Sequence, residues 1–379
     1  MIIHKFGGSS LADSSCFVRV AETIGSTTSR TAVVVSAMSG VTDELSACVA
    51  AAAGRYPGYR ERLAALQAKH VATARELLTA DGAASLIETF ERDFEDLNDV
   101  LRAAWILRDA SRGTFDMVMG YGEIWSAQLL ASLLMHRGIA SDWLNAREVL
   151  VVENSSRIPE VRWEESRERL SARQATRPME PDVLVITGFV AATAEGVPAT
   201  LGRNGSDYSA SIFAALLDAE EVHIWTDVDG VMSADPRFVP DAVLLDAISY
   251  HEASELAYFG AKIIHPATMG PAVERSIPIR IRNTFHPEGQ GTRIHVSGSS
   301  QMVKGLSTVE AVALESRAGS ALEVAAAKCQ GTPLRGEIEA REPGGLDRVT
   351  EGVAGEVARR LGDGPLRGRL RAWVAEAVA

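Results

Sequence analysis

The chain has 379 residues, of which 46% are hydrophobic, so it is long enough for two domains that bury a substantial core. Its formal net charge of -12 argues against general binding to nucleic acids or anionic membranes, because both favour basic surfaces. Three cysteines, no long apolar run and no leader-like start indicate a globular protein of a reducing compartment, the cytoplasm.

Short β-branched runs alternate with helical patterns through about the first 296 residues. The runs are MIIHKF at the start, TAVVVSA near 32, VLVV near 149, VLVITGFV near 183, EVHIWT near 221 and IPIRIR near 277. This alternation predicts an α/β fold, a three-layer sandwich with a mainly parallel sheet between helices. Between about 57 and 137 helical spacing predominates, which predicts a helical lobe that could offer a dimer face.

The first predicted strand runs into a lysine and two glycines, which suit a phosphoryl group. Lys5 stands at the strand end, where it can neutralise the charge of a transferred phosphoryl group. Gly7 and Gly8 let the backbone approach a phosphate closely, and Ser9 follows at a helix start. Neither a Walker A loop nor a G-x-G-x-x-G fingerprint follows a strand, so neither of these common nucleotide motifs explains the site.

A second glycine element, LGRNGSDYSA at 201–210, follows the run VLVITGFV. Gly202 and Gly205 allow a sharp turn that aims N–H groups at phosphate oxygens, and the helix starting near Ser206 adds its positive dipole end. Arg203 offers a planar fork that suits a carboxylate. Taken alone, the stretch could also be an ordinary helix cap.

A candidate nucleotide loop follows EVHIWT. In open α/β sheets, ligands gather at the carboxyl ends of strands, where Lys5, Ser36, Gly188 and Thr226 fall. Carboxylates suit ribose hydroxyls and cations suit phosphates, and the loop, joined by FGAKIIHP, supplies both in Thr226, Asp227, Asp229, Asp235, Arg237 and Lys262. DVDG is no calcium loop, because Phe238 stands at its twelfth position, and HEASE lacks a second zinc histidine, so no metal site of the protein's own is predicted.

Six motifs in this order resemble those of the aspartate kinases: KFGGSS, VVVSAMSGVTDEL at 33–45, GYGE at 120–123, LGRNGSDYSA, WTDVDGVMSADPR at 225–237 and FGAKIIHP at 259–266. The resemblance covers about residues 1–296 and extends to the kinase half of proteins that fuse aspartate kinase to homoserine dehydrogenase. It implies the amino acid kinase fold. It also implies a homo-oligomer, such as a dimer, that uses ATP and Mg²⁺ to phosphorylate the side-chain carboxylate of L-aspartate, the first step towards lysine, threonine and methionine.

The same resemblance implies roles for individual residues. Lys5 contacts the transferring phosphoryl group, and Asp207 organises Lys5 and the phosphate end. Arg203 clamps the substrate α-carboxylate, and Glu123 receives its ammonium. Further substrate contacts fall to Ser36, Thr42 and Ser206.

Several of these residues also have plainer interpretations. Glu123 could merely complement the dipole of the apolar helix that it opens, and Thr42 could merely cap the ELSACVAA helix. Met232 stands where many relatives have an aromatic residue near the nucleotide, and it can fill the same apolar gap. Two rival functions stay open: a kinase of another free amino acid, or a catalytically idle regulatory subunit.

The tail, residues 297–379, changes character. Its start, SSQMVKGLSTVEAVALESRAG, resembles the entry to the ACT regulatory domains of the family. An Ala-, Arg- and Glu-rich stretch follows and predicts helices near 318–329, 346–361 and 366–378, although VEAVALES could be a strand of a divergent ACT domain. The tail is therefore either a truncated or divergent ACT-like region or an extension, and we expect lysine and threonine to inhibit weakly or not at all.

Overall fold

The computed structural model describes residues 1–27, 29–153, 159–176, 181–237, 239–258, 266–298 and 305–318, single residues between 320 and 338, and residues 344–361 and 366–378. The chain divides into two compact units. The first is Met1–Ser307 with Ala377–Ala379, and the second is Thr308–Glu376. Each is described by itself.

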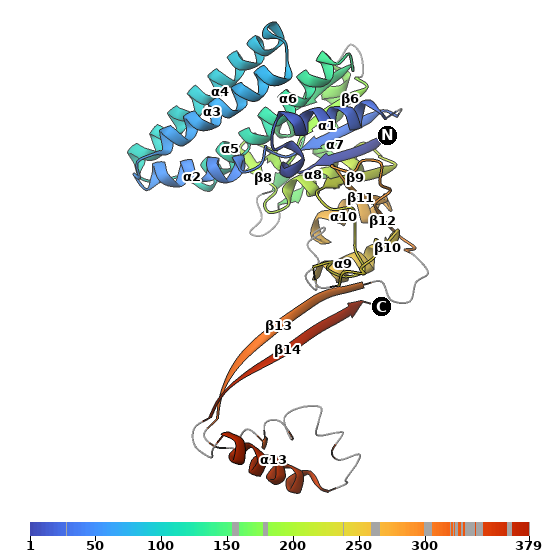
Figure 1. Ribbon diagram of the computed structural model, residues 1–379. Coiled ribbons are helices and arrows are strands. Elements are labelled where there is room, and N and C mark those ends of the chain that lie inside the picture. The colour runs from blue at the N-terminus through green and yellow to red at the C-terminus, as the bar shows by residue number, and fades with distance from the viewer. Residues whose placement is uncertain are drawn as a thin grey trace. The chain divides into compact units, whose positions relative to one another are not determined.

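An eight-stranded sheet forms the centre of the first unit (Figure 1), in the order β10-β12-β11-β9-β1-β2-β6-β3. The strands are β1 (Ile2–Phe6), β2 (Thr31–Val35), β3 (Ser141–Leu144), β6 (Val183–Thr187), β9 (Glu221–Thr226), β10 (Ala247–Ser249), β11 (Ile279–Asn283) and β12 (Thr292–His295). Among these strands every pair is parallel except β11 with β12. The predicted mainly parallel sheet is therefore confirmed.

Helices cover both faces of this sheet, because successive side chains of its central strands are apolar and point to opposite faces. Val33 and Val35 of β2 belong to one core, which they share with α1 (Ser14–Gly25) and α6 (Tyr121–His136). Val34 belongs to the other core, with α8 (Gly205–Leu216), α9 (Tyr250–Tyr258), α10 (Pro266–Glu274) and α7 (Trp163–Ala175). The sandwich thus has the three layers expected of it.

A helical lobe, made of α2 (Val41–Ala53), α3 (Tyr59–Leu77), α4 (Ala80–Leu107) and α5 (Arg112–Met119), extends from the sheet. Figure 1 shows α3 and α4 running side by side along it. Trp125 of α6 joins the lobe to the sheet: its ring stacks on Phe94 at 4.3 Å, and its Nε1 donates to Asp93 at 2.9 Å. The helical pattern predicted for about 57–137 is confirmed.

The predicted strand VLVV near 149 is wrong. After β3 the chain forms a short 3₁₀ helix, η2 (Ala146–Glu148), whose Ala146 amide donates to Thr187 Oγ1 at 2.8 Å, so the backbone leaves the sheet. Val151 makes a single bridge to Ala192, and Val152 and Glu153 form β4, which pairs with β5 (Glu160–Val161). The edge strand is instead β3, the half-buried segment SDWL, which lacks an apolar pattern. A small hairpin of β7 (Val190–Ala192) and β8 (Pro198–Thr200) follows β6.

The second unit holds two long strands and a helix. β13 (Gly305–Ala318) and β14 (Leu366–Val378) form a two-stranded sheet, and α13 (Leu346–Leu361) lies between them in sequence. The helix at 346–361 and the strand alternative for VEAVALES are confirmed. The helix predicted at 366–378 is wrong, because LRGRLRAWV alternates with the two-residue period of a strand, which its Ala and Arg content concealed. The helix predicted near 318–329 lies largely outside the described residues.

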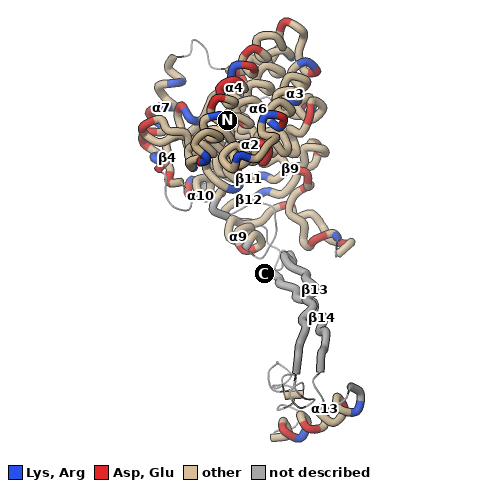
Figure 2. The backbone as a smooth tube through the Cα atoms, turned by 90° about the vertical axis from the view of Figure 1, so that its left-hand side faces the viewer, with Lys and Arg blue, Asp and Glu red and all other residues tan. Residues whose placement is uncertain are grey.

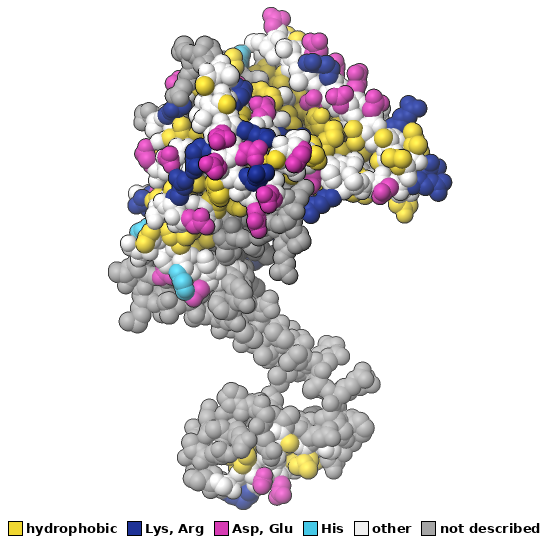
Figure 3. Space-filling view, turned by 180° about the vertical axis from the view of Figure 1, so that it is seen from behind, with side chains coloured by type: hydrophobic (Ala, Val, Ile, Leu, Met, Phe, Trp, Pro, Cys, Tyr) yellow, Lys and Arg dark blue, Asp and Glu magenta, His cyan; other side chains and the backbone are white. Residues whose placement is uncertain are grey.

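Acidic and basic residues are interspersed over the helices of the first unit (Figure 2). The rear face in Figure 3 shows the same mixture, with apolar side chains between the charges. Within the described part of the chain, no helix has both the length and the apolar character to span a bilayer.

The buried His70 of α3 makes stability depend on pH. Its Nδ1–H donates to Leu66 O at 2.7 Å, so a second proton would go to the buried Nε2, which has no partner among the described residues. Burial lowers the pKa of His70 from 6.5 to about 4. Below pH 6.5 the unfolded chain therefore binds a proton at His70, whereas the folded chain does so only near pH 4. Between pH 7 and pH 5 we expect the free energy of unfolding to fall by about 2 kcal/mol relative to His70→Gln. Urea titrations at both pH values measure this difference, and parallel pH dependence of the two proteins would contradict it.

Candidate active site

A cavity of about 420 Å³ lies at the carboxyl ends of β1, β2 and β6. Three segments far apart in sequence contribute to it: the loop from β2 into α2, the first turn of α6, and the loop that leads into α8. Predicted site residues line it together, namely Lys5, Gly8, Ser36, Thr42, Glu123, Arg203, Ser206 and Asp207. The parallel topology explains this meeting, because parallel strands deliver the residues that follow them to one edge.

Close backbone approach brings α8 against the end of β2. A Cβ atom on Gly188 would stand 2.8 Å from both the Ser206 Cβ and the Val35 carbonyl oxygen, so only glycine fits between them. The Ser36 hydroxyl then donates to Ser206 Oγ at 2.9 Å. The two serines therefore fasten the end of β2 to the start of α8.

The side chains of Lys5 and Asp207 form an ion pair of 2.7 Å inside the cavity, where they are 11% and 17% exposed. Lys5 comes from the centre of the sheet and Asp207 from the first turn of α8. A Cβ on Gly7 would lie 3.3 Å from Lys5 Nζ, and one on Gly8 would lie 3.2 Å from Ala37 O. The absent side chain of Gly7 thus leaves room beside the Lys5 ammonium, whereas Gly8 lets the backbone pack closely against Ala37.

Glu123 is a buried carboxyl in the first turn of α6, with 3% of its surface exposed. Its Oε2 has no hydrogen-bond partner among the described residues, although the residue lines the cavity. Burial raises the pKa of Glu123 to about 8, while the Ala37 amide, its own amide and Arg147 oppose that rise. A cation entering the cavity would supply the missing partner.

Arg203 is exposed at the cavity mouth, in the turn before α8. Gly202 and Asn204 on either side of it have left-handed backbone, with φ of +76° and +57°. No side chain caps α8, whose N-terminus points into the same region. No described residue pairs with the Arg203 guanidinium. The guanidinium and the N-terminus of α8 can therefore both interact with an anionic ligand.

The positions of Thr42, Ser9 and Gly7 are as follows. Thr42 does not cap α2, because Gly40 holds the cap position and Thr42 lies in the first helical turn, where it lines the cavity. Ser9 is exposed on the 3₁₀ helix η1 (Gly8–Leu11) and does not line the cavity. Gly7 caps η1 beside Lys5.

The predicted nucleotide residues lie after β9, outside the lining of this cavity. Thr226 donates to Asp227 at 3.1 Å, and Asp229 accepts from Asn283 at 2.7 Å. The Asp235 carboxylate receives Arg237 Nε at 3.0 Å and Nη2 at 2.5 Å, so in this state the two residues satisfy each other. Lys262, predicted to join them, lies outside the described residues.

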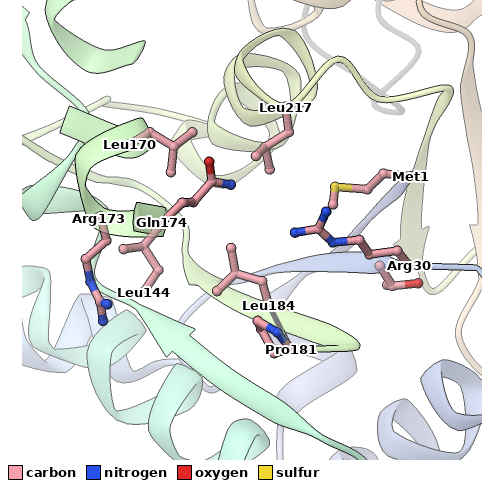
Figure 4. Close-up of a pocket in the computed structure, with 10 residues that line it drawn as sticks. Met1, Arg30, Leu144, Leu170, Arg173, Gln174, Pro181, Leu184 and Leu217 are labelled. Carbon is pink, nitrogen blue, oxygen red and sulfur yellow. The ribbon is translucent and has the colours of Figure 1, made fainter. Parts of the chain in front are cut away.

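A second cavity lies beside the first residues of β1, β2 and β6 (Figure 4). Its lining is largely apolar, with Leu144, Leu170, Leu184 and Leu217 around it. It encloses only about 20 Å³, room for a single water molecule, and none of the predicted site residues lines it. The cavity at the opposite ends of the strands is therefore the candidate active site.

No sequence motif pointed to the residues beneath this cavity. Arg147 of η2 donates to the carbonyl oxygens of Asp116 and Met117 at 3.1 and 2.9 Å. Asp116 in turn accepts from the Thr200 hydroxyl at 2.7 Å. These contacts join residues 31 and 84 positions apart, so no local pattern could have revealed them.

Comparison with known proteins identifies the family of this chain. The model of the Amino acid kinase family matches residues 1–283. The chain is 41% identical over 321 residues to the chloroplastic bifunctional aspartokinase/homoserine dehydrogenase 2 of Arabidopsis thaliana, a match that covers 82% of this chain and 35% of that protein. It is 34% identical to the lysine-sensitive aspartokinase 3 of Escherichia coli, over 78% of this chain and 64% of that protein. The chain thus spans about a third of the length of the bifunctional relatives that it matches.

A solved aspartokinase structure also matches the chain. The crystal structure of E. coli aspartokinase III in complex with aspartate and ADP superposes with a TM-score of 0.73 at 31% identity, over 89% of this chain and 75% of that one. The chain belongs to the amino acid kinase family and, within it, is similar to the aspartokinases.

Proposed function

We propose that this protein is an aspartate kinase, which transfers the γ-phosphoryl group of ATP to the side-chain carboxylate of L-aspartate. One observation carries the proposal: Glu123 and Arg203, of opposite charge, line one cavity with the Lys5–Asp207 ion pair. A free α-amino acid presents an ammonium and a carboxylate, which these two residues complement. The similarity to the aspartokinases supports aspartate among such acids.

In the proposed mechanism the protein orients aspartate and neutralises charge. Glu123 accepts the α-ammonium and Arg203 holds the α-carboxylate, which leaves the side-chain carboxylate towards Lys5. That carboxylate is already ionised near neutral pH, so no general base is needed to form the new P–O bond as the bond to ADP breaks. Asp207 holds the Lys5 ammonium in place, and Lys5 stabilises the charge on the transferring group.

The site also suits the phosphates of ATP. The space beside Lys5 that a Cβ on Gly7 would fill, and the uncapped N-terminus of α8, form a cradle for anionic oxygens. Mg²⁺ bound to the phosphates would neutralise further charge, and it prefers phosphate and water with few carboxylates. The exposed Asp227 and Asp229, at the end of β9, are the described carboxylates that we assign to the ribose and metal side of the nucleotide.

The proposal extends to the cellular setting. We place the reaction at the start of lysine, threonine and methionine synthesis, in the cytoplasm, and the free thiols of Cys16, Cys48 and Cys329 support a reducing compartment.

We also propose a homodimer. The exposed Ile106 and Leu107, at the end of α4, support a contact face on the helical lobe.

A coupled assay of ADP release across a panel of free amino acids tests the function. With Mg-ATP present, aspartate should support turnover well above that of glutamate, asparagine and N-acetylaspartate, since the last lacks the ammonium for Glu123. Turnover with another amino acid in place of aspartate would reassign the substrate, and no turnover with any of them would leave the chain without the proposed activity.

Replacing Lys5 by alanine should lower kcat at least about 100-fold, because charge on the phosphoryl group develops mainly in the transition state. The KM for aspartate should change little. Steady-state kinetics at saturating Mg-ATP measure both constants. A variant that keeps more than about a tenth of the wild-type kcat would remove Lys5 from the mechanism.

Replacing Glu123 by glutamine should raise the KM for aspartate about 10- to 100-fold, the worth of a hydrogen bond to a charged group. Since the pKa of Glu123 is about 8, the wild-type affinity for aspartate should rise as pH increases towards 8 and then level off. The reason is that only the ionised carboxylate pairs with the ammonium. Calorimetry from pH 6 to pH 8.5 measures the rise, and Glu123→Gln should show none. The same slope in both proteins would assign it to another group.

Arg203→Lys keeps the charge but loses the planar fork, so aspartate binding should weaken by about 1–3 kcal/mol. The affinity for ATP should change much less. Titration of each ligand separately distinguishes the two effects. An equal loss for both ligands would place Arg203 at the nucleotide.

A further inference from the structure

A polar network of one half-buried and two buried residues links the elements that carry the two residues assigned to the amino acid. Its members are Arg147 of η2, Asp116 of α5 and Thr200 of β8. Asp116 and Thr200 are both 4% exposed. None of them lines the cavity, so the mechanism above does not use them directly.

The Arg147 guanidinium lies across the junction of α5 and α6. Its Nη2 donates to the Asp116 and Met117 carbonyl oxygens at 3.1 and 2.9 Å, which places a cation at the negative end of α5. Only Gly120 separates α5 from α6, and a Cβ at that position would lie 2.0 Å from Nη2. The guanidinium therefore fills the space that a side chain at the junction would occupy.

This junction sets the position of Glu123, because α6 begins at Tyr121 and Glu123 lies in its first turn. The Tyr121 ring lies 6.0 Å from the guanidinium carbon of Arg147, which adds a second contact to the junction. At Gly122, a Cβ would lie 2.6 Å from the Ala37 Cβ, so α6 also meets the β2–α2 loop with no room to shift. Arg147 thus holds the helix start from one side while that loop bounds it on the other.

The second end of the network lies at the strand that leads to Arg203. The Thr200 hydroxyl donates to Asp116 Oδ1 at 2.7 Å, and Thr200 ends β8 three positions before Arg203. The Leu201 amide, next in sequence, donates to Phe189 O at 2.8 Å, so the strand end is fixed by its backbone as well. Asp116 therefore connects the junction that carries Glu123 to the strand that leads to Arg203.

We propose that Arg147, acting with Asp116 and Thr200, is a positioning residue for the amino acid substrate: it fixes Glu123 relative to Arg203 and holds positive charge behind the Glu123 carboxylate. The inference rests on the proposed function, because it assigns the ammonium to Glu123 and the α-carboxylate to Arg203. It adds that these contacts are set from beneath the cavity by residues that do not touch the substrate.

Replacement of Arg147 by methionine is the main test. The KM for aspartate should rise about tenfold, while kcat and the KM for ATP stay within about twofold. The pH midpoint of aspartate affinity should also move upward, because the Arg147 charge lowers the Glu123 pKa and its loss removes that effect. The other charged residues lining the cavity, Lys5, Asp43, Arg203 and Asp207, are unchanged in this variant. A purely structural role would raise KM without moving the midpoint.

Three further variants separate charge from geometry. Arg147→Lys should raise the KM for aspartate with the midpoint in place, since the charge stays and the fork is lost. Thr200→Val breaks the link to Asp116 and should raise that KM about two- to tenfold at an unchanged midpoint, whereas Asp116→Asn keeps the Oδ1 acceptor and should stay near wild type. Arg137→Met is the matched control at the other end of α6 and should behave as wild type.

Two results would overturn the inference. One is an Arg147→Met protein that binds ADP normally by calorimetry and keeps the wild-type KM for aspartate and pH midpoint. The other is a raised KM with a fixed midpoint in Arg147→Met, because Arg147 would then not place its charge on the Glu123 carboxylate as proposed. If Arg147→Met does not fold, wild-type KM values in both Arg147→Lys and Thr200→Val would overturn it.

Failure of the proposed function is distinguishable from these results. A wild-type protein that releases no ADP with aspartate contradicts the function but leaves the network to be tested directly. Carbon-13 NMR of glutamate-labelled protein, with Glu123→Gln for assignment, reports the Glu123 titration without substrate. Arg147→Met should raise that pKa, and an unchanged value would overturn the inference on its own.

Discussion

The ion pair between Lys5 and Asp207 joins the centre of the sheet to the first turn of α8, and the rest of the cavity is arranged around it. A charged pair with little exposure is retained only where both partners are held in good geometry, since removing either leaves an uncompensated charge. Here β1 fixes one partner through strands on both sides, and Gly188 lets α8 approach closely enough to supply the other. The absent side chain of Gly7 then keeps the Lys5 ammonium accessible to a ligand.

Two carboxylates in the same cavity have opposite environments. Asp207 pairs directly with a lysine, whereas the burial of Glu123 outweighs the opposing effect of Arg147 and raises its pKa to about 8. The difference allows separate tasks. Asp207 stays paired with Lys5 and organises the phosphoryl side, whereas the Glu123 carboxylate pairs with the ammonium of a substrate when it binds. The helical lobe supports this division, since Trp125, two residues after Glu123 in α6, packs against His70 and Phe94 of the lobe.

Much of this arrangement could be predicted from local sequence, because Lys5, Arg203 and Asp207 stand beside glycines that mark strand ends and helix starts. Glu123 followed from its place in GYGE, although its burial could not be foreseen. Arg147, Asp116 and Thr200 were beyond sequence reasoning, because they meet through folding of distant segments. The strand β14 was missed because residue composition was given more weight than two-residue periodicity, and β3 because an edge strand need not be apolar.

Gly120 has a consequence for how this family of sequences can vary. Its lack of a side chain is not a source of flexibility, because its backbone is in the ordinary helical region, with φ of -70° and ψ of -10°. The space that a side chain at position 120 would need is occupied by the Arg147 guanidinium. The two positions should therefore co-vary across relatives: a larger residue at 120 should coincide with a shorter, uncharged one at 147, and glycine at 120 should persist wherever arginine does.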